Sequence, residues 1–280
     1  MKALIIGYGR AGKRHARLLE ELGIKWRAYD PYMENLGNTR LFDETVSLES
    51  LSLRKHVAFD FAVICSPPAL HLDHIHQCLA ANLPVLCEKP LCSFGQLDLA
   101  RQLPPDSPVM PCFNYQFHPE VAAIREARDR WLDSPAAWRF YSDQYRPALP
   151  EWGLVLDHLP HTLDMLLWFA GDREIKIRQA FLNSLPEHYD SCYVYGRVGD
   201  QTFSIADTVR FKPCEKQAYI AGPVGVVPVG FNPDMFTKMY DCFLSHLRAG
   251  TLPVSGLGLA EALRVQELLE EIGKGVGESD

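Results

Sequence analysis

The chain begins with an apolar, strand-like segment that runs directly into the pattern Gly-x-Gly-x-x-Gly and then into a helical pattern. In such a junction Gly7 permits a tight turn, Gly9 lets the backbone approach a pyrophosphate, and Gly12 lets the helix pack closely on the strand. Arg10 and Ala11 lie within the same turn, where the free N–H groups of a helix start can hold phosphates. The junction therefore predicts a dinucleotide-binding site at the start of a strand–helix–strand fold.

A second strand is expected at residues 25–29, and it ends at Asp30. This acid follows the glycines by about twenty residues, where a carboxylate accepts hydrogen bonds from a ribose. Because a carboxylate repels a 2′-phosphate, Asp30 favours NAD(H) over NADP(H). Arg27 and Arg40 stand close enough in the sequence to leave the use of NADP(H) open. The alternative, a glycine turn without a ligand, requires all these features to coincide by chance.

Apolar segments alternate with helical patterns over the first part of the chain. Near-continuous apolar runs are typical of buried parallel strands. The expected elements are strands at 39–43, 59–65, 84–87 and 109–115 and helices at 47–56, 71–82 and 97–103. Their order predicts an α/β doubly wound parallel sheet of the Rossmann type, with ligands at the carboxyl ends of the strands.

The pattern changes near residue 117, which divides the chain into an expected dinucleotide-binding domain at 1–117 and a second domain at 118–280. Successive strands with few helices between them predict an α+β domain with a mostly antiparallel sheet. These strands are expected at 137–141, 175–183, 192–198, 201–211 and 217–220, and the helices at 120–132, 233–248 and 257–272. The last helix is expected to pack back on the first domain.

The amino-acid composition limits the classes of molecule that the protein is expected to bind. The 28 Lys and Arg residues against 35 Asp and Glu residues give a net charge of -7, which argues against a nucleic-acid-binding surface. The eight cysteines include no Cys-x-x-Cys pair, so neither a metal site nor a disulfide framework is expected. With no apolar run of membrane-spanning length and no signal peptide before the first strand, the sequence predicts a cytoplasmic protein with a small-molecule substrate.

Two further motifs resemble those of the glucose–fructose oxidoreductase / inositol dehydrogenase / rhizopine-catabolism (Gfo/Idh/MocA) oxidoreductase family. One is Glu88-Lys89-Pro90 after a buried strand, and the other is the segment GLVLDHLPHTLDMLLW at 153–168. With the glycine pattern, these motifs span most of the chain. The resemblance implies an NAD(P)-dependent dehydrogenase that acts on sugars, cyclitols or sugar nucleotides. It also implies a homodimer or homotetramer assembled through the sheet of the second domain, and a cis peptide bond before Pro90.

The same resemblance implies that Ser66, Pro67 and His71 bracket the adenosine and the nicotinamide ribose; the alternative for Ser66 is a helix cap. Glu88 and Lys89 end a predicted buried strand at the ligand-binding edge. The complete predicted cofactor-binding set is Gly7, Gly9, Arg10, Ala11, Gly12, Asp30, Ser66, Pro67, His71, Glu88 and Lys89.

The candidate catalytic residues are Lys89, Asp157 and His161. An ammonium at the ligand-binding edge can hydrogen-bond a substrate oxygen or transfer a proton. Asp157 and His161 are one helical turn apart, so the acid can orient the imidazole for acid–base chemistry. The alternatives are a solvated lysine paired with Glu88 and a structural Asp–His pair.

Local details refine this prediction. Pro160 does not suit a helix interior, so the helix is expected to begin near Asp157. Asp164 is expected to be structural and His158 to take no part. Gln116 stands where the family often carries arginine, which indicates a different substrate contact.

The resulting hypothesis is a hydride transfer in which His161 and Lys89 handle the proton, and which of the two is the base is left open. Two alternatives are kept. One is a sensor or regulator that binds NAD(H) without chemistry, and the other is an imine or tetrapyrrole reductase of the same fold.

Overall fold

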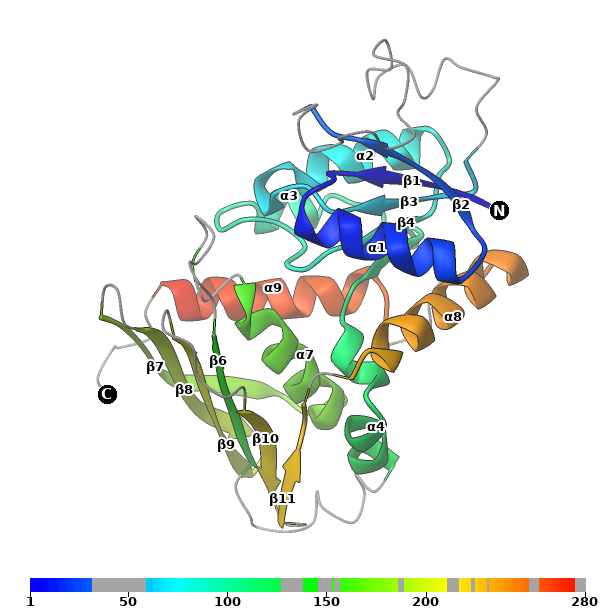
Figure 1. Cartoon of the computed structure of the whole chain (residues 1–280). Coiled ribbons are helices and arrows are strands. Elements are labelled where there is room, and N and C mark those ends of the chain that lie inside the picture. The colour runs from blue at the N-terminus through cyan, green and yellow to red at the C-terminus, as the bar shows by residue number, and fades with distance from the viewer. Residues whose placement is uncertain are drawn as a thin grey trace. The chain divides into compact units, whose positions relative to one another are not determined.

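The computed structural model describes residues 1–31, 59–126, 138–145, 153, 157–185, 189–210, 217–222, 225–230, 232–251 and 257–274 (Figure 1). The strand expected at 39–43, the helix expected at 47–56 and Arg40 lie outside these ranges. The chain forms two compact units. The N-terminal unit contains Met1–Phe113 and Phe236–Leu263, and the second unit contains Asn114–Met235 and Arg264–Asp280. Each unit is described by itself.

The N-terminal unit is built on a five-stranded parallel sheet in the order β2-β1-β3-β4-β5. The strands are β1 (Lys2–Ile6), β2 (Lys25–Tyr29), β3 (Phe61–Ile64), β4 (Val85–Cys87) and β5 (Val109–Pro111). Every residue of β3, β4 and β5 is buried, as their continuous apolar sequences predict. The doubly wound fold expected from the sequence is confirmed.

Helices cover both faces of this sheet. They are α1 (Arg10–Glu21), α2 (His71–Ala80) and α3 (Leu97–Ala100), with a 3-10 turn η3 (Pro68–Leu70) before α2; α1 and α2 lie on opposite faces (Figure 1). The unit also takes in most of α8 (Asp234–Ala249), whose Phe243 ring meets Phe61 of β3 edge to face at 5.3 Å. A segment of the C-terminal half thus completes the N-terminal core.

The second unit holds a six-stranded sheet in the order β11-β10-β6-β9-β8-β7. The strands are β6 (Trp138–Tyr145), β7 (Ile175–Leu185), β8 (Tyr189–Val198), β9 (Gln201–Arg210), β10 (Gln217–Gly222) and β11 (Gly225–Pro228). All neighbouring pairs are antiparallel except β6 and β9, which run parallel. The predicted α+β unit with a mostly antiparallel sheet is confirmed. Strands β8 and β9 form a hairpin in which Val198 pairs with Gln201.

Residues alternate strictly along β9 between a buried face and a more open face. The buried face packs on α7 (Leu159–Ala170), where the Phe169 ring stacks on Trp138 of β6 at 5.6 Å. The other helices among the described residues of this half are η4 (Asn114–Phe117), α4 (Pro119–Glu126) and α9 (Leu259–Gly273), and α9 is divided between the two units. The expected boundary after residue 117 falls at the end of η4.

Within the described ranges, no helix combines the length and the apolar character needed to cross a membrane. The described cysteines are all free thiols, and most of them are buried.

Candidate active site

The glycine turn lies between the end of β1 and the start of α1, at the carboxyl edge of the parallel sheet. Gly7 adopts a positive φ of 90°, which favours glycine. A Cβ at Gly7 would lie 2.6 Å from the Ser66 nitrogen, and a Cβ at Gly12 would clash with the Gly7 carbonyl oxygen. A Cβ at Gly9 would meet no described atom within 4 Å. The turn therefore needs Gly7 and Gly12 for its own packing, whereas Gly9 leaves open space where a phosphate can approach the start of α1.

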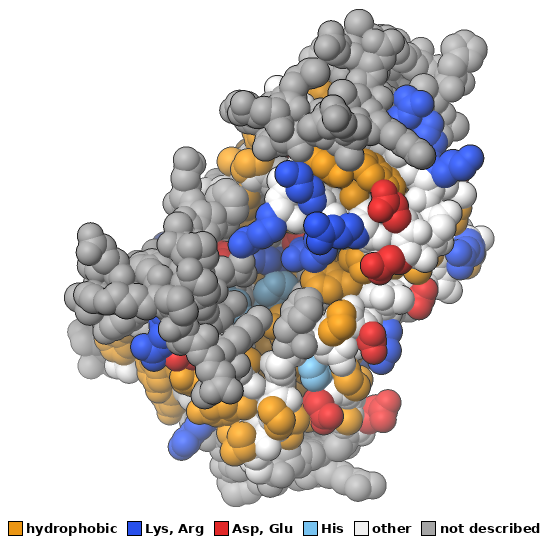
Figure 2. Space-filling model, in the orientation of Figure 1, with side chains coloured by type: hydrophobic (Ala, Val, Ile, Leu, Met, Phe, Trp, Pro, Cys, Tyr) orange, Lys and Arg blue, Asp and Glu red, His pale blue; other side chains and the backbone are white. Residues whose placement is uncertain are grey.

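Asp30, at the end of β2, is tied to this turn. Its Oδ2 accepts a 2.7 Å hydrogen bond from the Tyr8 backbone N–H, and the Gly7 N–H donates to the Tyr29 carbonyl at 2.8 Å. The carboxylate thus lies beside the glycine turn, which is the position predicted for ribose recognition. Arg10 and Lys13 are exposed near the start of α1, and Lys and Arg side chains gather on this face of the unit (Figure 2).

We expect Asp30→Asn to weaken discrimination against NADPH. The amide oxygen can still accept the Tyr8 N–H bond, but the negative charge that repels a 2′-phosphate is gone. The ratio of the NADPH Kd to the NADH Kd should fall by about tenfold, the effect of roughly one pair of close charges. Fluorescence titration with each cofactor measures this ratio, with Asp73→Asn on the exposed face of α2 as the control. An unchanged ratio would remove Asp30 from cofactor selection.

His71 links the loops that follow β3 and β4. The ring is buried, with Nδ1 lying 2.8 Å from the Pro90 carbonyl oxygen and Nε2 lying 2.7 Å from the Ser66 carbonyl oxygen. Burial lowers the pKa of His71, and the backbone bonds to Pro90 and Ser66 counteract part of this effect. The Ser66 hydroxyl lies 2.8 Å from His74 Nδ1, so its described bond is to a side chain of α2. Both ring nitrogens of His71 thus lie against the protein's own backbone.

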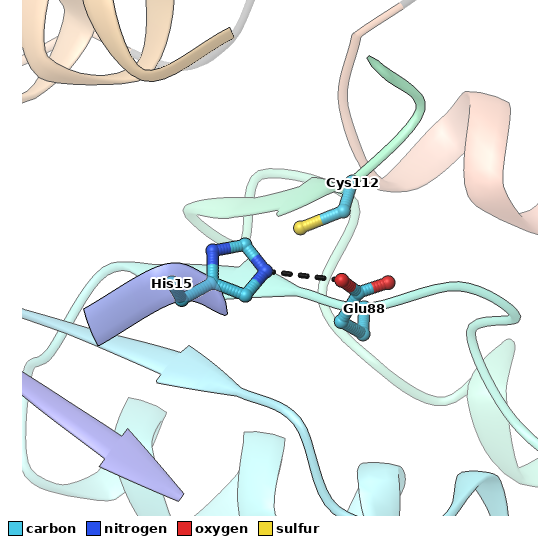
Figure 3. Close-up of side chains that lie close together, drawn as sticks. All are labelled: His15, Glu88 and Cys112. Atoms are coloured by element: carbon cyan, nitrogen blue, oxygen red, sulfur yellow. Dashed lines mark hydrogen bonds and ion pairs between the residues drawn. The ribbon is translucent and has the colours of Figure 1, made fainter. Parts of the chain in front are cut away.

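Glu88, directly after β4, is the centre of a buried polar cluster (Figure 3). Its Oε1 accepts a hydrogen bond from the Arg14 guanidinium and lies 3.0 Å from His15 Nε2, while His15 Nδ1 lies 2.7 Å from the Tyr240 hydroxyl. Burial alone would raise the pKa of Glu88, but the His15 hydrogen bond and the Arg14 and Lys89 cations outweigh it and hold the pKa well below the usual range. Glu88 is therefore a carboxylate.

Cys112 completes the cluster. Its Sγ, a carboxylate oxygen of Glu88 and a ring nitrogen of His15 all lie within 4.8 Å of one another (Figure 3). These three residue types can bind a metal ion. Here, however, Arg14 is bound to the carboxylate that such an ion would need, and burial, foremost among several causes, raises the pKa of the Cys112 thiol well above its ordinary value. We therefore interpret the cluster as a hydrogen-bonded network.

The ionised state of Glu88 predicts a loss of stability in acid. Because its pKa is lower in the folded protein than the ordinary value of 4.5, the unfolded chain takes up the proton first as the pH falls. The stability from this carboxylate is thus fully present above pH 4.5 and is lost progressively below it. Glu88→Gln should be less stable at pH 7 and should lose less stability between about pH 5 and pH 3. Urea unfolding at a series of pH values tests this, with Glu21→Gln as the exposed control; equal slopes would contradict it.

Lys89 is the residue directly after Glu88, whose carboxylate is held by Arg14 and His15. The Glu88 N–H donates to the Ile64 carbonyl at 2.8 Å, which ties the end of β4 to the end of β3. Lys89 itself is half-buried, and the peptide bond to Pro90 is cis, as the resemblance implied. The lysine therefore lies at the carboxyl edge of the sheet, where the sequence places it.

In the second unit, His161 lies in the first turn of α7. This helix begins at Leu159, close to the expected start, with Pro160 in its first turn. The Tyr115 ring meets the His161 ring at 5.2 Å. His161 lines a small pocket, together with Tyr115, Phe140, Tyr141, Ser142, His158, Thr162, Met165, Ala218, Tyr219, Ile220 and Val229. An imidazole thus opens onto a mostly apolar pocket.

The other polar residues of this segment contribute mainly to the fold. Asp164 is completely buried and accepts a hydrogen bond from Gln116. His158 is buried as well, with Nδ1 lying 3.3 Å from an Asp207 oxygen. Gln116 thus supports α7. Asp157 is also buried, just before the helix.

Lys89 belongs to the N-terminal unit, whereas Asp157 and His161 belong to the second unit. The joint action of the three residues therefore remains a prediction.

Arg14 and Tyr240, which take part in the Glu88 cluster, were not expected from the sequence. His15 stood in the sequence three residues after Gly12, but its partners could not be inferred. The sequence does not indicate a polar role for Tyr240, because this residue lies on the apolar face of a helix. It also stands 225 residues after His15 in the chain.

Residues 1–103 match the model of a family described as "Oxidoreductase family, NAD-binding Rossmann fold", the Gfo/Idh/MocA family. The N-terminal part of the chain is thus similar to that family, in agreement with the resemblance seen in the sequence. The chain is also 25% identical over 137 residues to inositol 2-dehydrogenase of Rubrobacter xylanophilus, a match that covers 45% of this chain and 38% of that protein. The matched segment thus spans less than half of the curated relative.

Solved structures resemble the whole chain. A putative myo-inositol dehydrogenase from Sinorhizobium meliloti is 18% identical with a TM-score of 0.78, and the match covers 99% of this chain and 97% of that one. The scyllo-inositol dehydrogenase from Lactobacillus casei, solved with NAD(H) and scyllo-inositol, is 16% identical with a TM-score of 0.75, covering 98% and 96%. At these identities the likeness establishes the fold of both units.

Proposed function

We propose that the protein is an NAD(H)-dependent dehydrogenase that transfers a hydride between the nicotinamide and a carbon bearing a hydroxyl or oxo group of a cyclitol, sugar or sugar nucleotide. The observation that carries the proposal is the glycine turn, with its open approach at Gly9, on the same sheet edge as Lys89. The match of residues 1–103 to the model of an NAD-binding oxidoreductase family and the inositol dehydrogenases among the relatives support it.

The residues present fit a dinucleotide. The start of α1 offers N–H groups for the pyrophosphate, and Asp30 lies beside the turn for the ribose. The bound nicotinamide would supply the hydride acceptor or donor. NAD(H) is the proposed cofactor because Asp30 is a carboxylate at the position that meets the 2′-oxygen.

The proton and the developing charge are assigned to side chains. We assign removal of the hydroxyl proton to His161, whose ring opens onto the pocket of the second unit, and stabilisation of the resulting oxygen charge to Lys89. In the reverse direction, the reduction of the oxo compound, the same two side chains act as acids. The pocket walls combine the apolar side chains of Phe140, Met165 and Ile220 with hydroxyl and imidazole groups.

The direct test is nicotinamide absorbance during incubation with NAD⁺ or NADP⁺ and a panel of cyclitols, sugars and sugar nucleotides, and with the reduced cofactors and the corresponding oxo compounds. We expect turnover with at least one cyclitol or sugar and a preference for NAD(H). Silence across the panel, with NADH still bound, would contradict the proposal and favour a cofactor-binding sensor. Turnover confined to imines or tetrapyrroles would instead establish the alternative reductase.

We also propose that the protein assembles as a homodimer or homotetramer through the open face of the second sheet. One row of paired residues crosses this face: Phe181, Tyr193, Ala206, Tyr141, Tyr219 and Pro228. Phe181 is 56% exposed and Tyr193 43% exposed, which is unusual for large apolar side chains next to each other. A second copy of the same face would cover them.

The double variant Phe181→Glu/Tyr193→Glu should therefore be monomeric where the parent protein is oligomeric, because two carboxylates cannot be buried against their copies. Light scattering after size-exclusion chromatography measures the mass of each. The control is Leu99→Glu on α3 of the N-terminal unit, which places a carboxylate on an exposed apolar side chain away from the second sheet. A monomeric parent protein, or an unchanged mass in the double variant, would refute this assembly.

A further inference from the structure

Tyr240 is completely buried in α8, yet its hydroxyl has a specific polar partner. The oxygen lies 2.7 Å from His15 Nδ1, and the opposite ring nitrogen of His15 lies 3.0 Å from Glu88 Oε1. All three residues belong to the N-terminal unit. Three side chains thus connect α8, through α1, to the residue immediately before Lys89.

The direction of the two hydrogen bonds follows from the chemistry of the partners. Glu88 is a carboxylate and can only accept, so His15 Nε2 must carry a proton. Burial raises the pKa of Tyr240 well above its ordinary value, so the phenol keeps its proton. With a neutral imidazole, only one arrangement satisfies both bonds: Tyr240 O–H donates to Nδ1, and Nε2–H donates to Glu88. Glu88 and Tyr240 thus require the same tautomer of His15, and the Tyr240 hydroxyl holds the ring at its second nitrogen.

The network ends inside the protein. Tyr240 has no exposed surface, and Cys65 and Cys112, whose charges would act on its phenol, have pKa values raised chiefly by burial. Because burial keeps the Tyr240 phenol protonated, this hydroxyl does not transfer its proton to another group. The network is therefore suited to fixing geometry rather than to moving protons.

The geometry that it fixes is that of the Glu88–Lys89 segment. The backbone of Glu88 is tied to β3, and its carboxylate is held by Arg14 and His15. Lys89 starts from this fixed residue, and its charge acts on the Glu88 carboxylate. A buried ion pair keeps its partners in place only when its remaining lone pairs are also satisfied.

We propose that Tyr240 is a positioning residue for Lys89, acting through the orientation of the His15 ring and the carboxylate of Glu88. The proposal rests on the proposed function, in which Lys89 contacts the substrate oxygen. It adds a residue from the C-terminal half of the chain that neither the motifs nor the comparisons assign.

The first experiment observes the imidazole without any substrate. In protein labelled with ¹⁵N-histidine, long-range ¹H–¹⁵N spectra should show His15 as the Nε2–H tautomer, with the resonance identified by its absence in His15→Phe. In Tyr240→Phe, Nε2 should keep its proton toward Glu88, and the ¹⁵N resonance of Nδ1 should move toward that of an unprotonated nitrogen without a hydrogen bond, because no donor faces Nδ1. An unchanged Nδ1 resonance in Tyr240→Phe would overturn the first link of the proposal.

The second experiment follows Lys89 in a double-mutant cycle of Tyr240→Phe and His15→Phe. The rate of acetylation of Lys89 by acetic anhydride, measured by mass spectrometry, needs no substrate. We expect about tenfold faster acetylation in each single variant, roughly the loss of one hydrogen bond to a charged group, and no further gain in the double variant. Additive effects would mean that Tyr240 acts by packing and not through His15, and an unchanged rate in Tyr240→Phe would exclude positioning.

Phe243→Leu is the matched control, because it alters the packing of α8 on β3 without touching the network. It should leave the acetylation of Lys89 unchanged even if it lowers the Tm. Turnover of myo-inositol with NAD⁺ is then measured in the same variants, and kcat should follow the same non-additive pattern while the NADH Kd stays constant. Absence of turnover in every protein, the parent included, would count against the proposed function, whereas the acetylation cycle would still decide whether Tyr240 positions Lys89.

Discussion

Replacing Lys89 by methionine is expected to lower kcat by at least about 100-fold, the usual effect of removing one donor to a developing oxygen charge. Methionine keeps most of the apolar length of the side chain but removes the ammonium, so the packing of the half-buried segment should survive. The NADH Kd should change by less than about threefold, because the phosphates and the ribose are held at the glycine turn and at Asp30. A loss of kcat with retained NADH binding would place Lys89 in the chemical step.

The control for this variant is Lys238→Met, which removes an exposed ammonium from α8. It should leave both kcat and the NADH Kd unchanged. Turnover by Lys89→Met at the parent rate would remove this lysine from the mechanism. A parallel loss of kcat and NADH binding would instead show that Lys89 acts mainly in holding the cofactor.

Gly12→Ala is expected to abolish cofactor binding by deforming the turn. The added Cβ would overlap the carbonyl oxygen of Gly7, a backbone atom that cannot move aside without moving the turn. Overpacking of this kind costs about 3 kcal/mol, which corresponds to a fall in Tm of roughly 6–12 °C for a chain of this size. Differential scanning fluorimetry and NADH titration together measure the two effects.

Gly9→Ala separates the two consequences, because its Cβ meets no described atom within 4 Å. It should leave the Tm within about 2 °C of the parent value and still weaken NADH binding by about tenfold or more, since the methyl group occupies the approach of the pyrophosphate. Gly230→Ala, which also has open space at its Cβ, should change neither quantity. Equal Tm losses at positions 9 and 12 would contradict the distinct roles given to these glycines.

The fold could be predicted from the sequence where local signals agree with the final packing. The runs at 59–65 and 84–87 became the fully buried strands β3 and β4, because parallel strands covered on both faces are continuously apolar. The strand segments of the second half became a mostly antiparallel sheet. The parallel pairing of β6 with β9 could not be inferred, because pairing between distant strands leaves no local pattern.

The candidate active site, like the fold, could be predicted from the sequence only where its motifs have a local geometry. The glycines and Asp30 belong to motifs whose geometry is local, and the structure places them at the carboxyl edge of the sheet. The cis Lys89–Pro90 bond was implied by the family resemblance alone. The partners of Glu88 and His15 could not be predicted, because they come from α1 and α8 and meet only when the N-terminal unit is complete. His158, expected to take no part, is buried against Asp207, a contact that only the sheet register creates.

The most direct test of hydride transfer is incubation with NAD⁺ and perdeuterated myo-inositol, followed by mass spectrometry of the cofactor. The account predicts NADH that carries one deuterium on the nicotinamide ring, formed by the parent protein and at least about 100-fold more slowly by Lys89→Met. If myo-inositol gives no turnover, the perdeuterated form of the best substrate from the panel takes its place. NADH without deuterium, or no NADH from any cyclitol or sugar despite cofactor binding, would contradict the account.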